Sequence, residues 1–215
     1  MSDKNINANY VKQNSIFLYD TINQETCAEL IGNLAEMVYN IKSHPTKNDT
    51  KTNTSPYDIN KSAPTIDVFI NSGGGQCSYM DSIMTFLNIA RSKGAIIRTT
   101  VTGRAASAAS QIAIQGTPGF RIMYQTAFHL VHYGNSSFNV SANGEAERAM
   151  KNEKQLRQNQ VNTYKKFTKL TDKEIAECMK TEHHVFSAQQ CLEKNMCDWI
   201  LTDTGLYISR ESNQR

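Results

Sequence analysis

Apolar residues recur along the chain with two different periods, and the change between them predicts the order of strands and helices. Short continuous apolar runs predict buried strands, whereas apolar residues three and four positions apart predict helices with one buried face. The predicted strands cover residues 16–19, 65–70, 95–101, 121–124 and 127–133. The predicted helices cover residues 24–39, 105–115 and 145–169. A further predicted helix buries Met80, Ile83, Met84 and Leu87 and ends near Lys93. Strand, helix and strand alternate in units of about 30 residues, which predicts an α/β fold with a parallel sheet covered by helices.

Long polar segments interrupt this pattern. Residues 1–13 are polar and predict a mobile arm ahead of a single domain over residues 14–215. Residues 40–63 are mostly Asn, Thr, Ser and Lys, and they predict a long exposed loop because they cannot bury enough apolar surface to offset the entropy of ordering. The predicted helix over residues 145–169 is highly charged, which is typical of a helix that projects from its domain or meets a partner.

Composition and charge narrow the function classes. The 215 residues carry 23 Lys and Arg against 20 Asp and Glu, and this net charge of +3 offers no electrostatic basis for binding nucleic acid or a membrane surface. No apolar run approaches the roughly 20 residues of a membrane span, and the polar start of the chain contains no apolar signal segment. We therefore expect a soluble, cytoplasmic protein with no nucleic-acid or membrane partner.

The cysteines argue against a disulfide framework and against a metal site. Five cysteines are present, which is an odd number, and no C-x-x-C pair or zinc-finger spacing to a histidine occurs. We expect buried thiols in a reducing compartment, no bound metal and no cofactor of the chain's own.

Three segments carry candidate chemistry, and the first is the glycine turn Gly73–Gly75 directly after a predicted buried strand. Glycines allow a tight turn and let backbone N–H groups face a substrate oxygen, as an oxyanion or phosphate site needs. The structural alternative is an ordinary turn between strand and helix. The segment is not G-x-G-x-x-G and lacks the Lys-Ser/Thr of a P-loop, so it offers little support for nucleotide binding.

The second segment is Gly103–Ser110, in which Ser107 lies among alanines between a predicted strand and a predicted helix. The N–H groups of the first helical turn favour negative charge on a substrate oxygen at such a place. The alternative is a capping serine in front of a helix of small residues. Ser110, one turn later, is expected to pack or to bond within its own helix.

The third segment is the strand over residues 127–133, which contains His129 and His132. Successive side chains of a strand point to opposite faces, so two histidines three positions apart lie on opposite faces and only one can point into a given site. A single strand histidine is more often structural than catalytic.

In order and spacing, these segments resemble the ClpP family of self-compartmentalising serine proteases. That family carries N-S-P-G-G, then G-x-A-A-S, then a histidine at the end of a later strand. The matching segments here are Asn71–Gly75, Gly103–Ser107 and His132. The similarity runs from residue 16 to the end of the chain and includes a late F-S-A segment at residues 186–188.

The resemblance implies a ClpP/crotonase-like α/β fold of βαβ units with a projecting handle at residues 134–169. It makes Ser107 the nucleophile and His132 the general base, and it assigns the oxyanion hole to the backbone N–H groups of Gly75 and Ala108. The imidazole would take the serine proton and then protonate the leaving amine.

The third member of the triad departs from the family pattern. The family has an aspartate where this chain has His183, and the usual proline of N-S-P-G-G is Gly73. We expect a Ser107–His132–His183 arrangement, with Glu182 as the alternative if the backbone is shifted by one residue. A neutral histidine adds no negative charge, and a corrupted third member costs a serine protease up to about four decades of rate. The structural alternative is a polar turn before a helix.

By the same resemblance, the chain is expected to be a serine endopeptidase that acts inside heptameric rings, stacked in pairs through the handle. Unfolded polypeptide would be delivered by an AAA+ unfoldase, which would supply the ATP-driven step because this chain has no ATP motif. The alternatives are a catalytically weak ring subunit that acts as scaffold or regulator, a crotonase-fold acyl-CoA enzyme, and a viral head-maturation protease.

Overall fold

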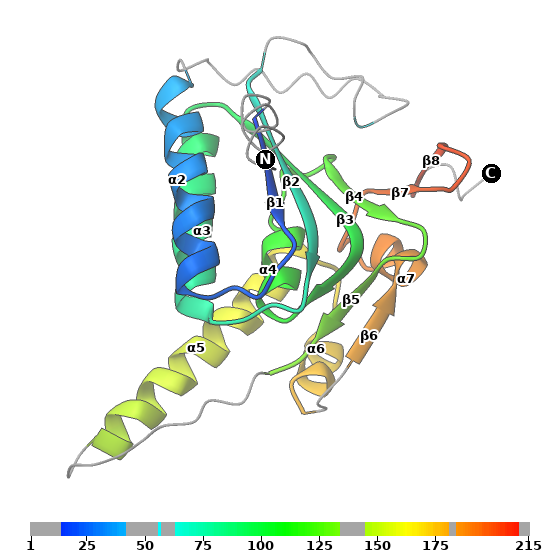
Figure 1. Ribbon diagram of the computed structural model, residues 1–215. Coiled ribbons are helices and arrows are strands. Elements are labelled where there is room, and N and C mark those ends of the chain that lie inside the picture. Colours follow the sequence, from blue (N-terminus) through cyan, green and yellow to red (C-terminus); the bar gives the residue numbers. More distant parts are fainter. Residues whose placement is uncertain (1–13, 42–55, 57–62, 134–144, 181–183, 211–215) are drawn as a thin grey trace, which may run out of the picture.

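The computed structural model describes residues 14–41, 56, 63–133, 145–180 and 184–210 (Figure 1). The strands are β1 (Ser15–Leu18), β2 (Thr65–Ser72), β3 (Ile96–Ala106), β4 (Arg121–Tyr124), β5 (Phe128–Val131), β6 (His184–Ser187), β7 (Trp199–Leu201) and β8 (Tyr207–Ser209). The helices are α2 (Gln24–Asn40), α3 (Cys77–Ser92), α4 (Ala108–Ile114), α5 (Glu145–Phe167), α6 (Asp172–Cys178) and α7 (Ala188–Glu193). The predicted arm, most of the predicted loop over 40–63 and residues 134–144 lie outside the described residues.

The strands form one mixed sheet whose main path runs β1-β2-β3-β4-β7-β8. The pairs β1/β2, β2/β3, β3/β4, β3/β5 and β4/β7 are parallel, and among the described strands only the pairs β5/β6 and β7/β8 are antiparallel. The predicted α/β fold with a largely parallel sheet is therefore confirmed. The long strand β3 pairs with β4 at residues 99–101 and with β5 at its last three residues. At the carboxyl end of β3, β5 therefore takes the place of β4 as the neighbouring strand.

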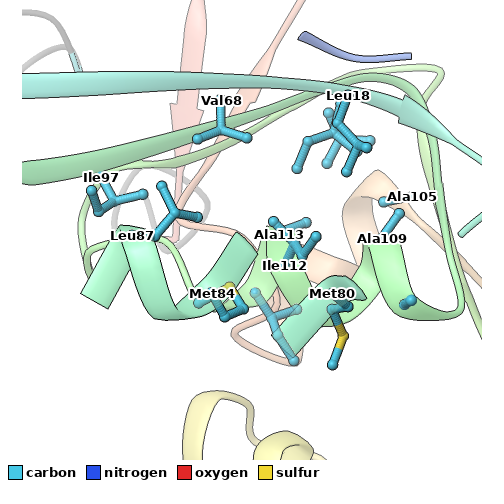
Figure 2. Close-up of a cluster of buried hydrophobic side chains, with 14 of the residues drawn as sticks. Leu18, Val68, Met80, Met84, Leu87, Ile97, Ala105, Ala109, Ile112 and Ala113 are labelled. Carbon is cyan, nitrogen blue, oxygen red and sulfur yellow. The ribbon is translucent and has the colours of Figure 1, made fainter. Parts of the chain in front are cut away.

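Helices α2 and α3 lie side by side over one face of the sheet (Figure 1). Their apolar faces meet side chains from β1, β2 and β3, and Figure 2 shows Leu18 and Val68 above Leu87 of α3. Helix α4 is buried at every position, which its small and aliphatic residues permit. It lies between the sheet and the carboxyl-terminal end of α5, while the rest of α5 extends away from the body (Figure 1).

Two sequence-based boundaries were wrong. Strand β3 runs on through Gly103 to Ala106. The sequence analysis had ended the strand at residue 101 and begun the next helix at Ala105. The last three residues of β3 are held in the sheet by β5, through the pairs Arg104↔Phe128 and Ala106↔Leu130. A short buried segment of small residues has no periodicity that separates strand from helix, so tertiary pairing decides.

The structure also contains a strand that the sequence pattern did not predict. Strand β6 begins at His184 and pairs antiparallel with β5, with Val131 opposite His184. It is four residues long and half of it is exposed, so it lacks the continuous apolar run that marks the other strands. The interpretation of this segment as a polar turn before a helix was therefore wrong from His184 onward.

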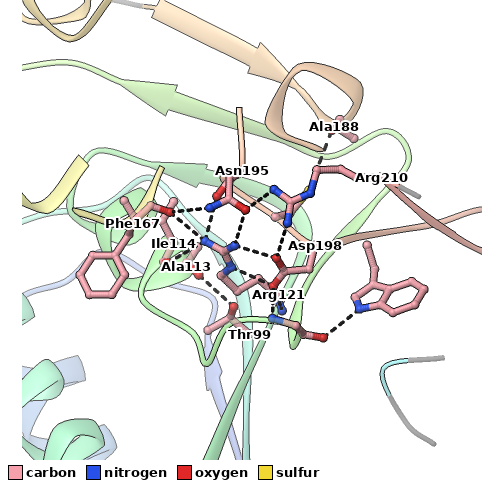
Figure 3. Close-up of polar contacts among 12 residues, drawn as sticks. Thr99, Ala113, Ile114, Arg121, Phe167, Ala188, Asn195, Asp198 and Arg210 are labelled. Carbon is pink, nitrogen blue, oxygen red and sulfur yellow. Dashed lines mark hydrogen bonds and ion pairs between the residues drawn. The ribbon is translucent and has the colours of Figure 1, made fainter. Parts of the chain in front are cut away.

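A buried ion pair between Arg121 and Asp198 links the start of β4 to the segment before β7 (Figure 3). Arg121 at the start of β4 donates to both carboxylate oxygens of Asp198, with Nη2 to Oδ1 at 2.7 Å and Nε to Oδ2 at 2.9 Å. Its Nη1 also donates to the carbonyl oxygens of Phe167 and Asn195. The guanidinium thus links β4, the segment before β7 and the end of α5.

Candidate active site

Ser107 occupies a strained turn between β3 and α4. Its backbone has φ 53° and ψ −121°, and only two other described residues that are not glycine, Asn14 and Asn195, have a positive φ. Such a conformation costs on the order of 1–3 kcal/mol and persists only where the surroundings enforce it. The side chain makes no capping hydrogen bond to α4, so Ser107 is not a simple capping serine. A sharp strand-to-helix turn of this kind is how hydrolases expose a nucleophilic serine.

The end of β5 lies directly beside this turn. The Ser107 N–H donates to the carbonyl oxygen of Leu130 at 2.8 Å, which continues the parallel pairing of β3 with β5. His132 follows Leu130 by two residues, just past the end of β5, and is half-buried. Because the carboxyl ends of parallel strands meet at one edge of a sheet, the structure brings Ser107 and His132 to the same edge.

The glycine turn is packed against Ser107 from the other side. A Cβ added at Gly74 would lie 2.4 Å from the carbonyl oxygen of Ala106 and 2.8 Å from the Cβ of Ser107. Gly74 also has φ +87°, a conformation that side chains rarely adopt. At Gly75 an added Cβ would lie 2.2 Å from the carbonyl oxygen of Ile22. Only glycine permits both close approaches.

The polar residues before the glycines hold the turn in place. Asn71 accepts a hydrogen bond from the Arg104 N–H at 3.1 Å through its side-chain oxygen. The Ser72 hydroxyl donates to the carbonyl oxygen of Asp20 at 2.5 Å and accepts from the Gly74 N–H at 3.1 Å. The segment is therefore anchored to both β3 and the end of β1, and its position next to Ser107 follows from these contacts.

The resemblance to the ClpP family assigns the oxyanion hole to the backbone N–H groups of Ala108 and Gly75. Ala108 is the first residue of α4, and an N–H in the first turn of a helix has no acceptor within that helix. Gly75 lies in the glycine turn that packs on Ser107, where the hydrogen bonds to Ile22 are made by the Gly74 carbonyl and the Gln76 N–H. Ala108 thus follows Ser107 directly, and Gly75 lies in the turn that packs on Ser107 through Gly74. Their role as an oxyanion hole stays a prediction.

Both candidates for the third member of the triad, His183 and Glu182, lie outside the described residues, so that expectation stays a prediction. The described pairing of β5 with β6 ends at Val131 and His184, which are the neighbours of His132 and of residue 183 in the chain. The His184 ring itself packs on Phe186, with the ring centroids 4.7 Å apart.

A second Ser–His pair, which the sequence analysis did not find, lies in the core. The Ser110 hydroxyl is 2.8 Å from Nδ1 of His129, and both residues are fully buried. Tyr164 of α5 donates its hydroxyl hydrogen to Ser110 at 3.2 Å. Of the two roles expected for Ser110, packing in the core is confirmed, whereas its hydroxyl bonds to His129 and Tyr164 rather than within its own helix. Because the pair has no access to solvent, it is a structural contact that joins α4, β5 and α5.

Burial sets the charge state of this pair. Desolvation, followed by the positive charge of Arg121, lowers the pKa of His129 to about 3. The imidazole therefore stays neutral at physiological pH. The same burial raises the pKa of the Tyr164 hydroxyl far above its usual value. The network is uncharged, which lets it remain in the core.

This low pKa predicts acid-dependent stability. Between pH 6.5 and 4.5 the unfolded chain protonates His129 while the folded chain does not, so folding stability falls as the pH falls through this window. We expect the wild type to lose about 2 kcal/mol more than His129→Gln across it, measured by urea unfolding at each pH. Equal losses of folding stability in the wild type and His129→Gln would contradict the low pKa of His129 in the folded chain.

The described residues contain no group of three or more His, Cys, Asp or Glu side chains placed to hold a metal ion. All five cysteines are free thiols, and all except the half-buried Cys77 are buried. Within the part of the chain that the structure describes, no helix is both long and apolar enough to cross a membrane.

Comparison with known proteins agrees with this geometry. The model of the Clp protease family matches residues 55–204, which include the glycine turn, Ser107 and His132. The ATP-dependent Clp protease proteolytic subunit 2 of Leifsonia xyli subsp. xyli (strain CTCB07) is 28% identical over 145 residues. That alignment covers 64% of this chain and 60% of the relative's length.

Proposed function

Because this chain belongs to the Clp protease family, we propose that it is a serine endopeptidase in which Ser107 attacks the peptide carbonyl. One observation carries the proposal: Ser107 is held on a strained turn, with the glycine turn packed on one side and the end of β5 bonded on the other. Ser107 is half-buried, and the end of β5 that precedes His132 lies at the same edge of the sheet, which supports this role. An ordinary turn between strand and helix does not need this strain.

The proposed reaction follows the serine-protease sequence. Ser107 Oγ forms a bond to the carbonyl carbon while His132 accepts the hydroxyl proton. The N–H groups of Gly75 and Ala108 stabilise the oxyanion, and His132 then gives its proton to the leaving amine. Water attacks the resulting acyl-enzyme with His132 again as base, which releases the new carboxyl end and restores Ser107. In this proposal His183, or Glu182 in its place, orients the imidazole.

We further propose that the chain acts as a ring, heptameric and stacked in pairs, in the cytoplasm. Helix α5 extends from the body and is exposed along its outer part, with Met150 at 69% exposure, which suits a contact between copies. The name of the relative describes an ATP-dependent protease subunit, and this supports delivery of unfolded polypeptide by an AAA+ unfoldase. The sequence has no P-loop, so ATP would be used by that partner alone.

Labelling with a fluorophosphonate tests the nucleophile. We expect a single adduct on Ser107, mapped by mass spectrometry, because activated serines react and unactivated ones do not. Ser107→Ala and His132→Ala should each abolish the adduct. Ser110→Ala is the matched control, since it removes the serine of the buried Ser–His pair and should leave labelling of Ser107 intact.

The labelling result also separates the alternatives. An adduct on Ser107 that survives His132→Ala would remove His132 as the base. No adduct in a correctly assembled ring would favour a scaffold subunit. Labelling repeated with His183→Ala and Glu182→Ala identifies the third member by the variant that slows the reaction.

A further inference from the structure

Tyr133, the residue that follows the proposed general base, is held by two side chains of α5. Its hydroxyl donates to the Glu153 carboxylate, with a distance of 3.0 Å to Oε1. The guanidinium carbon of Arg157 lies over the Tyr133 ring, 3.7 Å from the ring centroid. Tyr133 and Glu153 are half-buried, whereas Arg157 is exposed. None of these three residues has a role in the proposed reaction.

The two contacts match the polarity of a tyrosine side chain. The phenol hydroxyl is a hydrogen-bond donor, and a carboxylate is a strong acceptor for it. The face of the ring is negative and attracts a cation that lies within about 6 Å of the centroid. Glu153 and Arg157 are four residues apart on α5, so they lie on the same face of the helix and reach the same ring. Burial, followed by the hydrogen bond to Glu153, raises the pKa of the Tyr133 hydroxyl, so the phenol keeps the proton that it donates.

These contacts lie where the sheet stops holding the chain. The strand pairs of β5 with β3 end at Leu130, whose carbonyl oxygen accepts from the Ser107 N–H. The strand pairs of β5 with β6 end at Val131, one residue before His132. The His132 backbone therefore lies between Val131, which is fixed by the sheet, and Tyr133, which is fixed by α5.

Helix α5 is attached to the body by other contacts as well. Gln160 and Tyr164 of α5 are 7% and 2% exposed. The Gln160 Nε2 donates to Sγ of Cys77 at 3.4 Å, and the Tyr164 hydroxyl donates to Ser110 at 3.2 Å. These buried contacts fix the carboxyl-terminal half of α5. The contacts of Tyr133 therefore restrict mainly the short segment that follows β5.

We propose that Tyr133 is a positioning residue for the general base, and that Glu153 and Arg157 act through it. Because its backbone is held between β5 and α5, His132 stays at the edge of the sheet that carries Ser107. Release of the α5 contacts frees the segment on one side, and a displacement of about 1 Å costs reacting groups on the order of a hundredfold in rate. This inference rests on the proposed peptidase function, which makes His132 the base.

Substitutions at Tyr133 test the proposal. Tyr133→Ala removes both contacts, and we expect kcat for peptide hydrolysis to fall by about tenfold to a hundredfold with KM within about twofold, because the base moves while the substrate contacts stay. Tyr133→Phe removes only the hydroxyl and keeps the ring next to Arg157, so kcat should fall by about threefold. Tyr39→Ala is the matched control, since it removes a tyrosine that is 85% exposed in α2, and it should change neither constant. A rise in KM with kcat unchanged would overturn the proposal.

A double-mutant cycle tests whether Glu153 acts through Tyr133. If the two side chains work through one hydrogen bond, Tyr133→Phe/Glu153→Ala loses no more activity than the more damaging single variant. Losses that multiply would overturn the role given to Glu153.

Carbethoxylation of His132 separates this proposal from the peptidase itself. In the Ser107→Ala background the probe is diethyl pyrocarbonate, and mass spectrometry follows its adduct on His132. We expect this adduct to form at least about twofold faster when Tyr133→Ala is added and at an unchanged rate when Tyr39→Ala is added, because a segment freed on one side opens more often. That result supports the positioning role even if the wild type gives no fluorophosphonate adduct. An unchanged rate with Tyr133→Ala overturns the positioning role, while a fluorophosphonate adduct on Ser107 leaves the peptidase standing.

Discussion

Gly74→Ala is expected to reduce peptidase activity at least about a hundredfold, because displacement of reacting groups by about 1 Å costs that much. The added Cβ would meet the Ala106 carbonyl oxygen at 2.4 Å and the Ser107 Cβ at 2.8 Å, and both are parts of the β3 to α4 turn that cannot rotate away. The turn must therefore move, and Ser107 and the Ala108 N–H move with it. The measurement is kcat/KM for peptide hydrolysis together with the rate of fluorophosphonate labelling.

Gly73→Ala is the matched control for this substitution. An added Cβ at Gly73 has the side chain of Arg104 as its nearest contact, at 3.4 Å, which is ordinary van der Waals contact. We expect activity within about twofold of the wild type, as for other surface substitutions that create no clash. Similar activity losses in the two variants would show that glycine flexibility, rather than close approach to Ser107, is what the turn requires.

The strain at Ser107 and the contact at Gly74 have a common cause. The N–H of Ser107 is bonded to Leu130, so β5 fixes where the turn begins, and the following helix α4 is buried on all sides. The backbone between these two fixed elements is forced to φ 53°. A relaxed serine at this point would have to break the β3–β5 pairing or shift a helix out of the core, and both cost more than the strain.

The sequence predicted the parts of the site that depend on local chemistry. Glycines after a strand and a serine before a helix have conformational consequences within a few residues, so Gly73–Gly75 and Ser107 were found from the chain alone. These are the features for which local sequence and tertiary structure agree. His132 was chosen through the resemblance to the ClpP family, and the parallel pairing of β3 with β5 is what puts it at the same edge of the sheet as Ser107.

The parts that were missed depend on contacts between distant segments. Ser110 lies 19 residues from His129 and 54 from Tyr164, and no local pattern signals that these three side chains meet. Their burial depends on α5 packing against α4, although α5 is the most polar of the described helices. Strand β6 was missed for the same reason, since it exists through its pairing with β5 rather than through its own residues.

Loss of the buried carboxylate is expected to have the largest effect on stability, and Asp198→Ala should lower the free energy of unfolding by about 3–5 kcal/mol. Asp198 is 7% exposed and accepts hydrogen bonds from the Arg121 guanidinium and from the N–H groups of Gly119 and Arg121. Its removal leaves the Arg121 charge buried without a counter-charge, and Arg121 is itself only 3% exposed. Urea unfolding measures the difference, with Asp198→Asn as the milder variant if Asp198→Ala does not fold.

Asp172→Ala is the control for that loss, because it removes an aspartate from an ion pair at the surface. Asp172 lies 2.8 Å from Lys165, and its side chain is 80% exposed. An exposed pair contributes about 0.2–1 kcal/mol, so this variant should lose no more than about 1 kcal/mol. A loss below about 1 kcal/mol for Asp198→Ala would mean that the Arg121 charge finds water or other acceptors when Asp198 is gone. The carbonyl oxygens of Phe167 and Asn195, which already accept from Arg121, would then be sufficient to hold the guanidinium.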